Sequence, residues 1–365
     1  MTSERLARVH TVLDELHVDA VLIASPANRC YLTGFSGDLG GNTTRDVVLV
    51  HRGGATLLTY PIHTAWASSE VVPGIDVIGK VDWLASAAEV IEREGWTMLA
   101  IDDTALPHAA AVKLREALPD TVGVVLLGNR LAGLRARKET PELEAMRVAS
   151  AITDRVLTEA AGWLDVGMTE RGVARRIKET FYRLGADDLA FDVIVASGPN
   201  AAKPHHRPTD RAMAEGDAVV VDLGCRLDRY CSDLTRTLSV GPPTERFATL
   251  YNATLAARDA AVRLVEPGRP ASEVATAAGD VLRGLGLGDL LMHGLGHGVG
   301  LQVHEAPAIN ETSEDVLAVG DVFSVEPGVY DPGWGGVRTE DVVVVTDDGC
   351  ETITTAPTLD LGRGA

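Results

Sequence analysis

Apolar residues recur along this chain with two different spacings, which predict helices in some stretches and strands in others. Leu6, Val9, Leu13 and Leu16 are separated by three or four residues, which predicts an amphipathic helix. Short apolar runs predict strands at residues 20–24, 46–50, 55–60, 98–101 and 122–127, and helical stretches near 62–69, 82–94 and 107–118 lie between them. This alternation is typical of an α/β layer domain.

A second domain is expected after a basic stretch between Gly128 and Lys138. This stretch leads into Thr140-Pro141 followed by acidic residues, which is a strong helix start. We therefore expect domains at residues 1–130 and 131–365, because 365 residues exceed what one hydrophobic core usually holds. Helical patterns near 141–162, 169–184, 244–265 and 271–285 would cover the outside of a sheet in the second domain.

Composition narrows the possible partners. The net charge of −19 disfavours nucleic acid and anionic membranes, since both reward basic surfaces. No apolar run reaches the roughly 18 residues of a membrane span, and the start of the chain lacks a hydrophobic signal region. The four cysteines show neither metal-binding spacing nor a disulfide pattern. We expect a cytoplasmic protein with no nucleic-acid or membrane partner.

Two aspartates flank a candidate hairpin. Asp222 ends the apolar run that starts at Ala218, and Asp233 begins the next strand-like run. If Leu227 and Asp228 form the tip, the two aspartates stand directly opposite one another, with Cβ atoms about 5 Å apart. Carboxylates that close repel strongly, so a cation or a shared proton must compensate, and a metal is the favoured answer.

Three further residues occupy similar positions. His297 lies among glycines 294, 296, 298 and 300, and each would cost a helix about 1 kcal/mol against alanine, so we expect an irregular loop. Glu326 ends an apolar run before Pro-Gly, and Glu340 opens a run typical of a buried strand. Side chains at strand ends are held rigidly, as a metal site requires.

Each of these residues alone has a plainer interpretation. An aspartate before Leu-Gly is usually a turn residue, and an isolated histidine is more often a surface or core residue than a ligand. Four carboxylates and one imidazole together predict a dinuclear metal site. Oxygen-rich ligation favours manganese or cobalt, with iron and zinc behind.

The same segments resemble those of the pita-bread metallopeptidases, the family that includes methionine aminopeptidase, aminopeptidase P, prolidase and creatinase. The matching blocks are residues 221–224, 232–237, 293–298, 325–330 and 336–341, and residues 194–208 are similar to the family's substrate-histidine segment. Residues 28–36 look like the amino-terminal domain of creatinase and prolidase. The resemblance implies an α/β creatinase-like amino-terminal domain followed by an α+β pita-bread catalytic domain.

The resemblance also implies a role for each candidate residue. Two divalent ions would be held by Asp222, Asp233, His297, Glu326 and Glu340, with Asp233 and Glu340 bridging both. Glu326 would also handle the proton of a metal-bridging hydroxide. On the substrate side would lie the catalytic His205 and His304, together with His293 and the supporting or substrate-binding Arg338. His206 follows His205 directly and is expected to be an exposed neighbour, whereas Glu305 could be either a contact of a metal ligand or a surface carboxylate.

The implied activity is metal-dependent hydrolysis of the Xaa-Pro bond in short peptides. An Xaa-Pro dipeptidase, which requires a free carboxylate on proline, is slightly favoured over an aminopeptidase P acting on longer peptides. The amino-terminal domain counts against methionine aminopeptidase. Retention of all five ligand positions counts against a creatinase-like C–N hydrolase and a non-enzymatic binding protein. Relatives suggest a homodimer.

Overall fold

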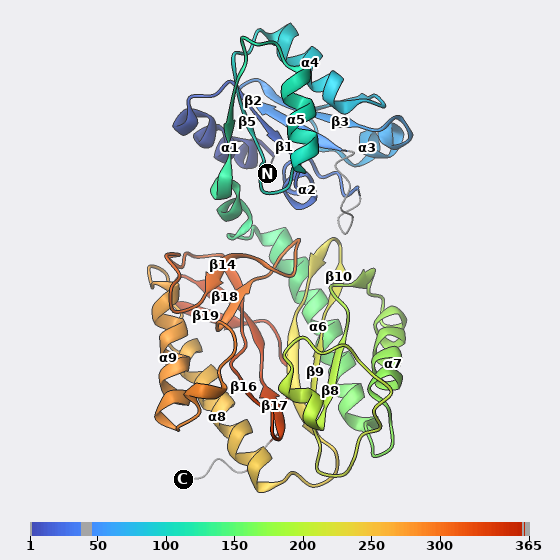
Figure 1. Ribbon diagram of the computed structural model, residues 1–365, viewed down its shortest axis with the longest axis vertical. Helices are drawn as coiled ribbons and strands as arrows, with labels where there is room; N and C mark the ends of the chain where they lie inside the picture. The colour runs from blue at the N-terminus through green and yellow to red at the C-terminus, as the bar shows by residue number, and fades with distance from the viewer. Residues whose placement is uncertain (1, 38–45, 360, 362–365) are drawn as a thin grey trace. The chain divides into compact units, whose positions relative to one another are not determined.

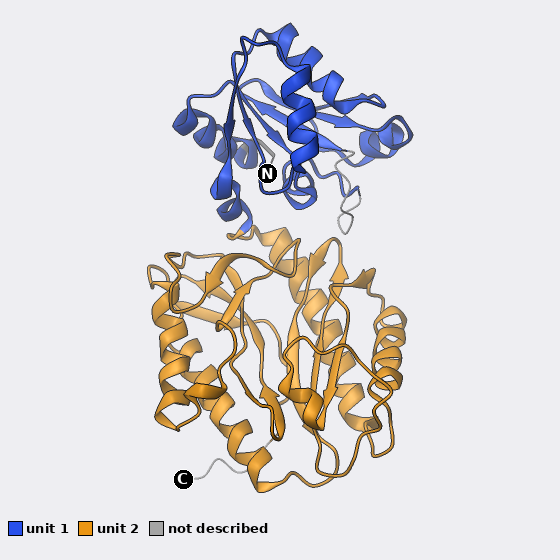
Figure 2. Ribbon diagram, in the orientation of Figure 1, with its two compact units in different colours: residues 1–135 blue, residues 136–365 orange. Residues whose placement is uncertain are grey.

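The computed structural model describes residues 2–37, 46–359 and 361. The chain forms two compact units, Met1–Arg135 and Ala136–Ala365 (Figure 2). Their junction lies inside the basic stretch in which the domain boundary was expected, five residues beyond the expected position at 130.

Unit 1 is a mixed six-stranded sheet with helices on its faces (Figure 1). The strand order is β4-β3-β2-β1-β5-β6, in which β1 pairs antiparallel with β2 and parallel with β5. The strands are β1 (Ala20–Ile23), β2 (Val47–His51), β3 (Gly54–Thr59), β4 (Ile75–Gly79), β5 (Met98–Ile101) and β6 (Gly123–Leu126). The helices are α1 (Thr2–Leu16), α2 (Pro26–Thr33), α3 (Thr64–Glu70), α4 (Trp83–Glu94) and α5 (His108–Ala117), with 3₁₀ turns η1 (Pro61–His63) and η2 (Gly128–Arg135). The predicted α/β layer domain is confirmed; β4 and α2 were not predicted.

Unit 2 consists of two halves, each with a pair of helices packed on strands (Figure 1). The first half contains α6 (Thr140–Trp163), α7 (Glu170–Arg183), β7 (Asp188–Leu189), β8 (Ile194–Ser197), η3 (Gly198–Ala202), β9 (Ala218–Leu223), β10 (Cys225–Leu227), β11 (Tyr230–Cys231) and β12 (Leu234–Ser239). The second contains α8 (Glu245–Val262), α9 (Ala271–Gly284), η4 (Gly288–Leu290), β13 (Gly296–Gly298), β14 (Glu305–Ile309), β15 (Val322–Val325), β16 (Gly328–Asp331), β17 (Gly335–Arg338), β18 (Asp341–Thr346) and β19 (Gly349–Thr352). All four predicted helices are present.

Side-chain alternation along the strands separates the apolar core from the polar interior. In β9, Val221 and Leu223 join the core beneath α6 and α7, so Asp222 between them faces the other side of the sheet. In β15, Phe323 and Val325 join the core beneath α8 and α9, and the next residue, Glu326, follows on the opposite face. Both halves therefore turn carboxylates away from their helices.

The expected register of the hairpin is wrong by two residues. Asp222 pairs with Thr235, and Leu227 pairs with Tyr230, so the tip is Asp228-Arg229 rather than Leu227-Asp228. Both tip residues have positive φ, 47° and 78°, as a two-residue turn of the hairpin type requires. Asp233 therefore lies diagonally from Asp222 on the same face instead of directly opposite.

The glycine-rich stretch around His297 was expected to be an irregular loop. That is wrong for Gly296–Gly298, which form the short strand β13, whereas glycines 294 and 300 lie outside the strand. It lies between β14 and β15 with a bulge between His297 and Gly298. A Cβ at Gly296 would collide with the carbonyl of Ser324, and one at Gly298 with the carbonyl of Ala306. The glycines thus permit close packing of β13 against its neighbouring strands.

Candidate active site

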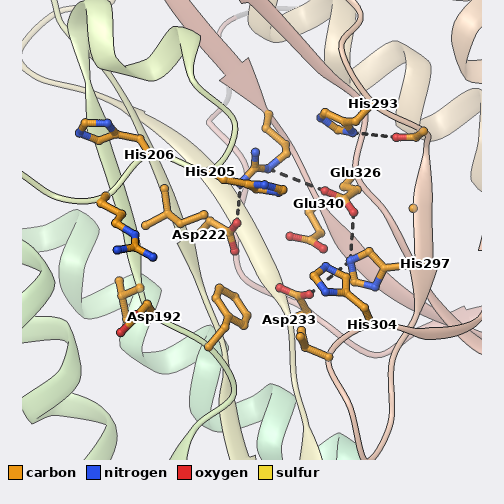
Figure 3. Close-up of a pocket in the computed structure, with 18 of the residues that line it drawn as sticks. Asp192, His205, His206, Asp222, Asp233, His293, His297, His304, Glu326 and Glu340 are labelled. Atoms are coloured by element: carbon orange, nitrogen blue, oxygen red, sulfur yellow. Dashed lines mark hydrogen bonds and ion pairs between the residues drawn. The ribbon is translucent and has the colours of Figure 1, made fainter. Parts of the chain in front are cut away.

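A cavity of about 450 Å³ in unit 2 brings together all nine residues singled out from the sequence. Figure 3 shows the carboxylates of the central group pointing towards one another, with His297 and His304 beside them. The nine are His205, Asp222, Asp233, His293, His297, His304, Glu326, Arg338 and Glu340. The volume is within the usual range for a small-molecule site, roughly 300–1,000 Å³.

The centre of the cavity is a cluster of buried acids. Ligand atoms of Asp233, His297 and Glu340 lie within 4.8 Å of one another. Asp222, Asp233 and Glu340 are only 8%, 4% and 2% exposed, so water screens their charges little. Oδ1 of Asp222 is buried and accepts no hydrogen bond from any residue that the structure describes. A buried carboxylate oxygen is normally paired with a hydrogen-bond donor or a cation.

Burial raises the pKa of Asp233 well above its usual value, and the charges of Glu340, Asp222 and Glu326 raise it further. Burial and the charges of Glu326 and Asp222 likewise raise the pKa of Glu340. These acids therefore resist ionisation together unless a cation joins them.

Glu326 behaves in the opposite way. Burial alone would raise its pKa, but the hydrogen bond and positive charge of His297, followed by the charge of Arg338, lower it to about 2. His297 Nε2 lies 3.2 Å from Glu326 Oε1 and 3.8 Å from Asp233 Oδ2. The other ring nitrogen, Nδ1, lies 3.1 Å from the carbonyl oxygen of Gly298, which leaves Nε2 facing the acids.

Arg338, in the second half of unit 2, contacts residues of both halves. Its Nη2 donates to Asp222, its Nε donates to Thr235 Oγ1 at 3.1 Å, and its Nη1 donates to Tyr330 Oη at 2.9 Å. Nη1 also donates to the carbonyl of Pro204 at 3.2 Å. Because every guanidinium nitrogen already has a protein acceptor, Arg338 supports the cluster.

Thr235 and Tyr330 take part in the site although the sequence assigned them no role. The Thr235 hydroxyl donates to Glu340 Oε2 at 2.8 Å, and Tyr330 Oη lies 2.7 Å from Nε2 of His293. Burial raises the pKa of Tyr330 to about 12. Both residues lie in sequence blocks that carried the family resemblance, and those blocks were the feature of the sequence that could have pointed to them.

The segment that carries His205 is anchored on a buried carboxylate of α7. Glu170 Oε1 accepts from Ser197 N, Ser197 Oγ and Asn200 Nδ2 at 2.9, 2.8 and 3.0 Å. Its Oε2 contacts His206 Nε2 and accepts from Thr209 N, both at 2.9 Å, and from Thr209 Oγ1 at 2.6 Å. Burial opposes ionisation of Glu170, but these donors outweigh it and lower the pKa to about 2. His206 is thus a buried anchor of this segment, and the expectation of an exposed neighbour is wrong.

His304 is placed by its own neighbours in a similar way. Its ring stands edge-on to His297, with centroids 4.1 Å apart. The next residue, Glu305, forms a buried ion pair with Lys138, with Nζ 2.8 Å from Oε1. Burial and the charge of His297 lower the pKa of His304, so near neutral pH its ring is mainly neutral.

Two helix-backed halves that converge carboxylates and histidines on one cavity define the class of pita-bread metallopeptidases. The chain belongs to metallopeptidase family M24, which residues 144–347 match, and residues 5–137 match the Creatinase/Prolidase N-terminal domain. Proteins of this family use divalent metal ions, and the acid cluster is where this chain could hold them.

Similar proteins cover nearly the whole chain. An Xaa-Pro dipeptidase of Pyrococcus furiosus is 34% identical over 351 residues, 96% of this chain and 97% of the relative. The structure of an Xaa-Pro dipeptidase from Bacillus anthracis has a TM-score of 0.93 at 30% identity, covering 98% of this chain and 99% of that one. The structure of an X-Pro aminopeptidase from Thermotoga maritima has a TM-score of 0.86 at 29% identity, covering 96% of this chain and 98% of that one.

Among helices in the described part of the chain, none combines the length and hydropathy of a transmembrane segment.

Proposed function

We propose that this protein is a metal-dependent exopeptidase that hydrolyses the Xaa-Pro bond of dipeptides and short peptides, with dipeptides preferred. The observation that carries the proposal is the convergence of four carboxylates, three of them buried, and His297 in one cavity. Relatives named as Xaa-Pro dipeptidases support the proline specificity.

The proposed metal ligands are Asp222, Asp233, His297, Glu326 and Glu340, which would hold two divalent ions. The residues fit such ions, because Asp222 Oδ1 lacks a donor among the described residues and Asp233 and Glu340 repel each other without a cation. The oxygen-rich ligand set favours manganese, then cobalt, with iron and zinc behind. Bound divalent ions lower the pKa of a water molecule and stabilise negative charge on a carbonyl oxygen.

The chain's own residues would supply proton transfer and orientation. Glu326 is the proposed proton acceptor for the attacking water, since its low pKa keeps the carboxylate ionised near neutral pH. His205 and His304 are both exposed to the cavity, and each can donate a hydrogen bond to the scissile carbonyl as its oxygen gains charge.

Arg338 and His293 fit supporting roles. The buried guanidinium of Arg338 holds Asp222 and Tyr330 in place, and Tyr330 in turn lies against His293. Loss of Arg338 or His293 would therefore reduce activity mainly by changing the orientation of neighbouring residues.

The second candidate is aminopeptidase P activity on longer peptides, which the similarity to the Thermotoga maritima X-Pro aminopeptidase favours. The homodimer and the cytoplasmic location expected from the sequence stay predictions.

The test is hydrolysis of Ala-Pro against Ala-Pro-Ala by metal-stripped protein to which manganese is returned. We expect hydrolysis of Ala-Pro to dominate and to require the metal. Dominant release of alanine from Ala-Pro-Ala would establish the aminopeptidase alternative, and turnover of neither peptide would refute Xaa-Pro hydrolysis. For variants of the acid cluster such as Asp233→Asn, the matched control is Asp289→Asn, which removes an exposed carboxylate outside the cavity.

A further inference from the structure

Two arginines line the cavity in the described part of the chain, and they differ in how they are bonded. Arg338 is 2% exposed and donates from Nε, Nη1 and Nη2 to protein acceptors. Arg207 is exposed and makes no hydrogen bond or ion pair with any residue that the structure describes. Arg207 is therefore the arginine whose charge is available to a ligand.

The backbone beneath Arg207 is held on both sides. The preceding residue, His206, contacts Glu170 at 2.9 Å, and Thr209, two residues further on, donates to Glu170 from its backbone N and its hydroxyl. Because this backbone is already anchored, a ligand that pairs with Arg207 needs to order only its side chain.

Arg207 also lies close to His205, which is proposed to contact the scissile carbonyl. It follows His205 by two residues, so their Cα atoms are at most about 7 Å apart, the reach of two extended residues. In an Xaa-Pro dipeptide the scissile carbonyl carbon and the carboxylate carbon are separated by the proline nitrogen and Cα. A cation beside His205 can therefore meet the carboxylate while His205 contacts the carbonyl.

The surroundings favour an anion there only when the metals are bound. Five carboxylates and two arginines line the cavity, so two divalent ions would leave these groups with a net charge of +1. The outer acid, Asp192, pairs with Lys178 at 3.2 Å. Phe191 and Pro208 line the same cavity and offer apolar surface to a proline ring.

We propose that Arg207 binds the free carboxylate of the substrate's proline and thereby determines the preference for dipeptides. This inference rests on the proposed Xaa-Pro hydrolysis. An arginine pairs with a carboxylate through two parallel hydrogen bonds. In a longer peptide the same position holds a neutral amide, which cannot form that ion pair.

The experiment compares Ala-Pro with Ala-Pro amide in the manganese-loaded wild type and in Arg207→Met. We expect Arg207→Met to raise KM for Ala-Pro about ten- to hundredfold, the range for a lost charged hydrogen bond, and to change KM for the amide by less than about twofold. Arg207→Lys should recover part of the loss, because it restores the charge without the bidentate geometry. Metal content and the thermal unfolding midpoint should match those of the wild type.

The matched control is Arg175→Met. Arg175 is an exposed arginine of α7 outside the cavity, and it has no hydrogen bond or ion pair to the residues described. Its loss should leave both substrates unaffected. An equal loss on Ala-Pro and its amide in Arg207→Met, or no loss on either, would overturn the assignment.

A binding measurement separates failure of this inference from failure of the proposed function. If the wild type cleaves neither substrate, Xaa-Pro hydrolysis is refuted, and calorimetry of the manganese-loaded proteins with L-proline and L-prolinamide still tests Arg207. We expect the wild type to bind L-proline more tightly than L-prolinamide and Arg207→Met to lose that difference. A wild type without the preference, or a variant that retains it, contradicts the inference.

Discussion

Replacing Asp233 with asparagine should have opposite effects on stability with and without metal. The side chain is 4% exposed, and its ligand atom lies within 4.8 Å of that of Glu340. Burial and three neighbouring carboxylates raise its pKa well above the usual 3.8. Asparagine keeps the shape of the side chain and removes the charge.

The size of the effect follows from the spacing of the acids. Two unit charges 4.8 Å apart, the limit for this cluster, interact by about 3.5 kcal/mol at an effective dielectric constant of 20. Because the folded pKa is raised, ionisation at neutral pH opposes folding, and the penalty disappears below the unfolded value of 3.8. Metal-free Asp233→Asn should therefore be about 1–3 kcal/mol more stable than the wild type at pH 7, with a smaller gain near pH 4.

Metal should reverse this order. A ligand at one hundred times its dissociation constant stabilises a folded protein by about 2.7 kcal/mol, and the variant lacks a proposed metal ligand. The assay is urea unfolding of chelator-treated protein at pH 7 and pH 4, with manganese added at pH 7, and with Asp289→Asn as the control. A metal-free variant less stable than the wild type at pH 7, or one stabilised equally by manganese, would refute the reasoning.

Three other changes test the surrounding residues. His304→Ala should reduce turnover about 10²–10³-fold while metal content, measured by elemental analysis, stays near wild type; stoichiometric metal loss would instead make His304 a ligand. Glu170→Gln should lower kcat/KM by loosening the His205 segment. It should also lower the free energy of unfolding at pH 7, but much less near pH 2. The reason is that the lowered folded pKa of Glu170 stabilises the protein above the ordinary value of 4.5, and this stabilisation is lost as pH falls through about 2. An equal deficit at both pH values would exclude the charge of Glu170 as its cause. Lys138→Met should cost about 3–5 kcal/mol in urea unfolding, because it removes the buried cation opposite Glu305, and a loss below about 1 kcal/mol would contradict that account.

The sequence predicted which side chains face the site more reliably than it predicted their pairing. Asp222 and Glu326 were singled out because each ends an apolar run, and the structure turns both away from the helices of their halves. The hairpin register depended on a turn at Asp228-Arg229, both with positive φ. Arginine is not a residue that signals such a turn, so the sequence offered little to locate the tip.

Contacts between distant segments were beyond sequence reasoning. Thr235 reaches Glu340, and Glu170 holds the segment around His206, only after the strands and helices have packed. An isolated threonine or a glutamate in the first turn of a helix has a sufficient local explanation, such as strand propensity or the helix dipole. Their roles depend on three-dimensional neighbours that a single sequence does not identify.

The most direct test of the account is a manganese titration of metal-stripped protein, with Ala-Pro and Ala-Ala hydrolysis and bound metal measured on the same samples. We expect no activity without metal, saturation at two ions per chain, and a specificity constant for Ala-Pro at least about tenfold that for Ala-Ala. Full activity in metal-free protein would contradict the metal site, and saturation at one ion would contradict its dinuclear form. Equal turnover of the two dipeptides would contradict the proline specificity.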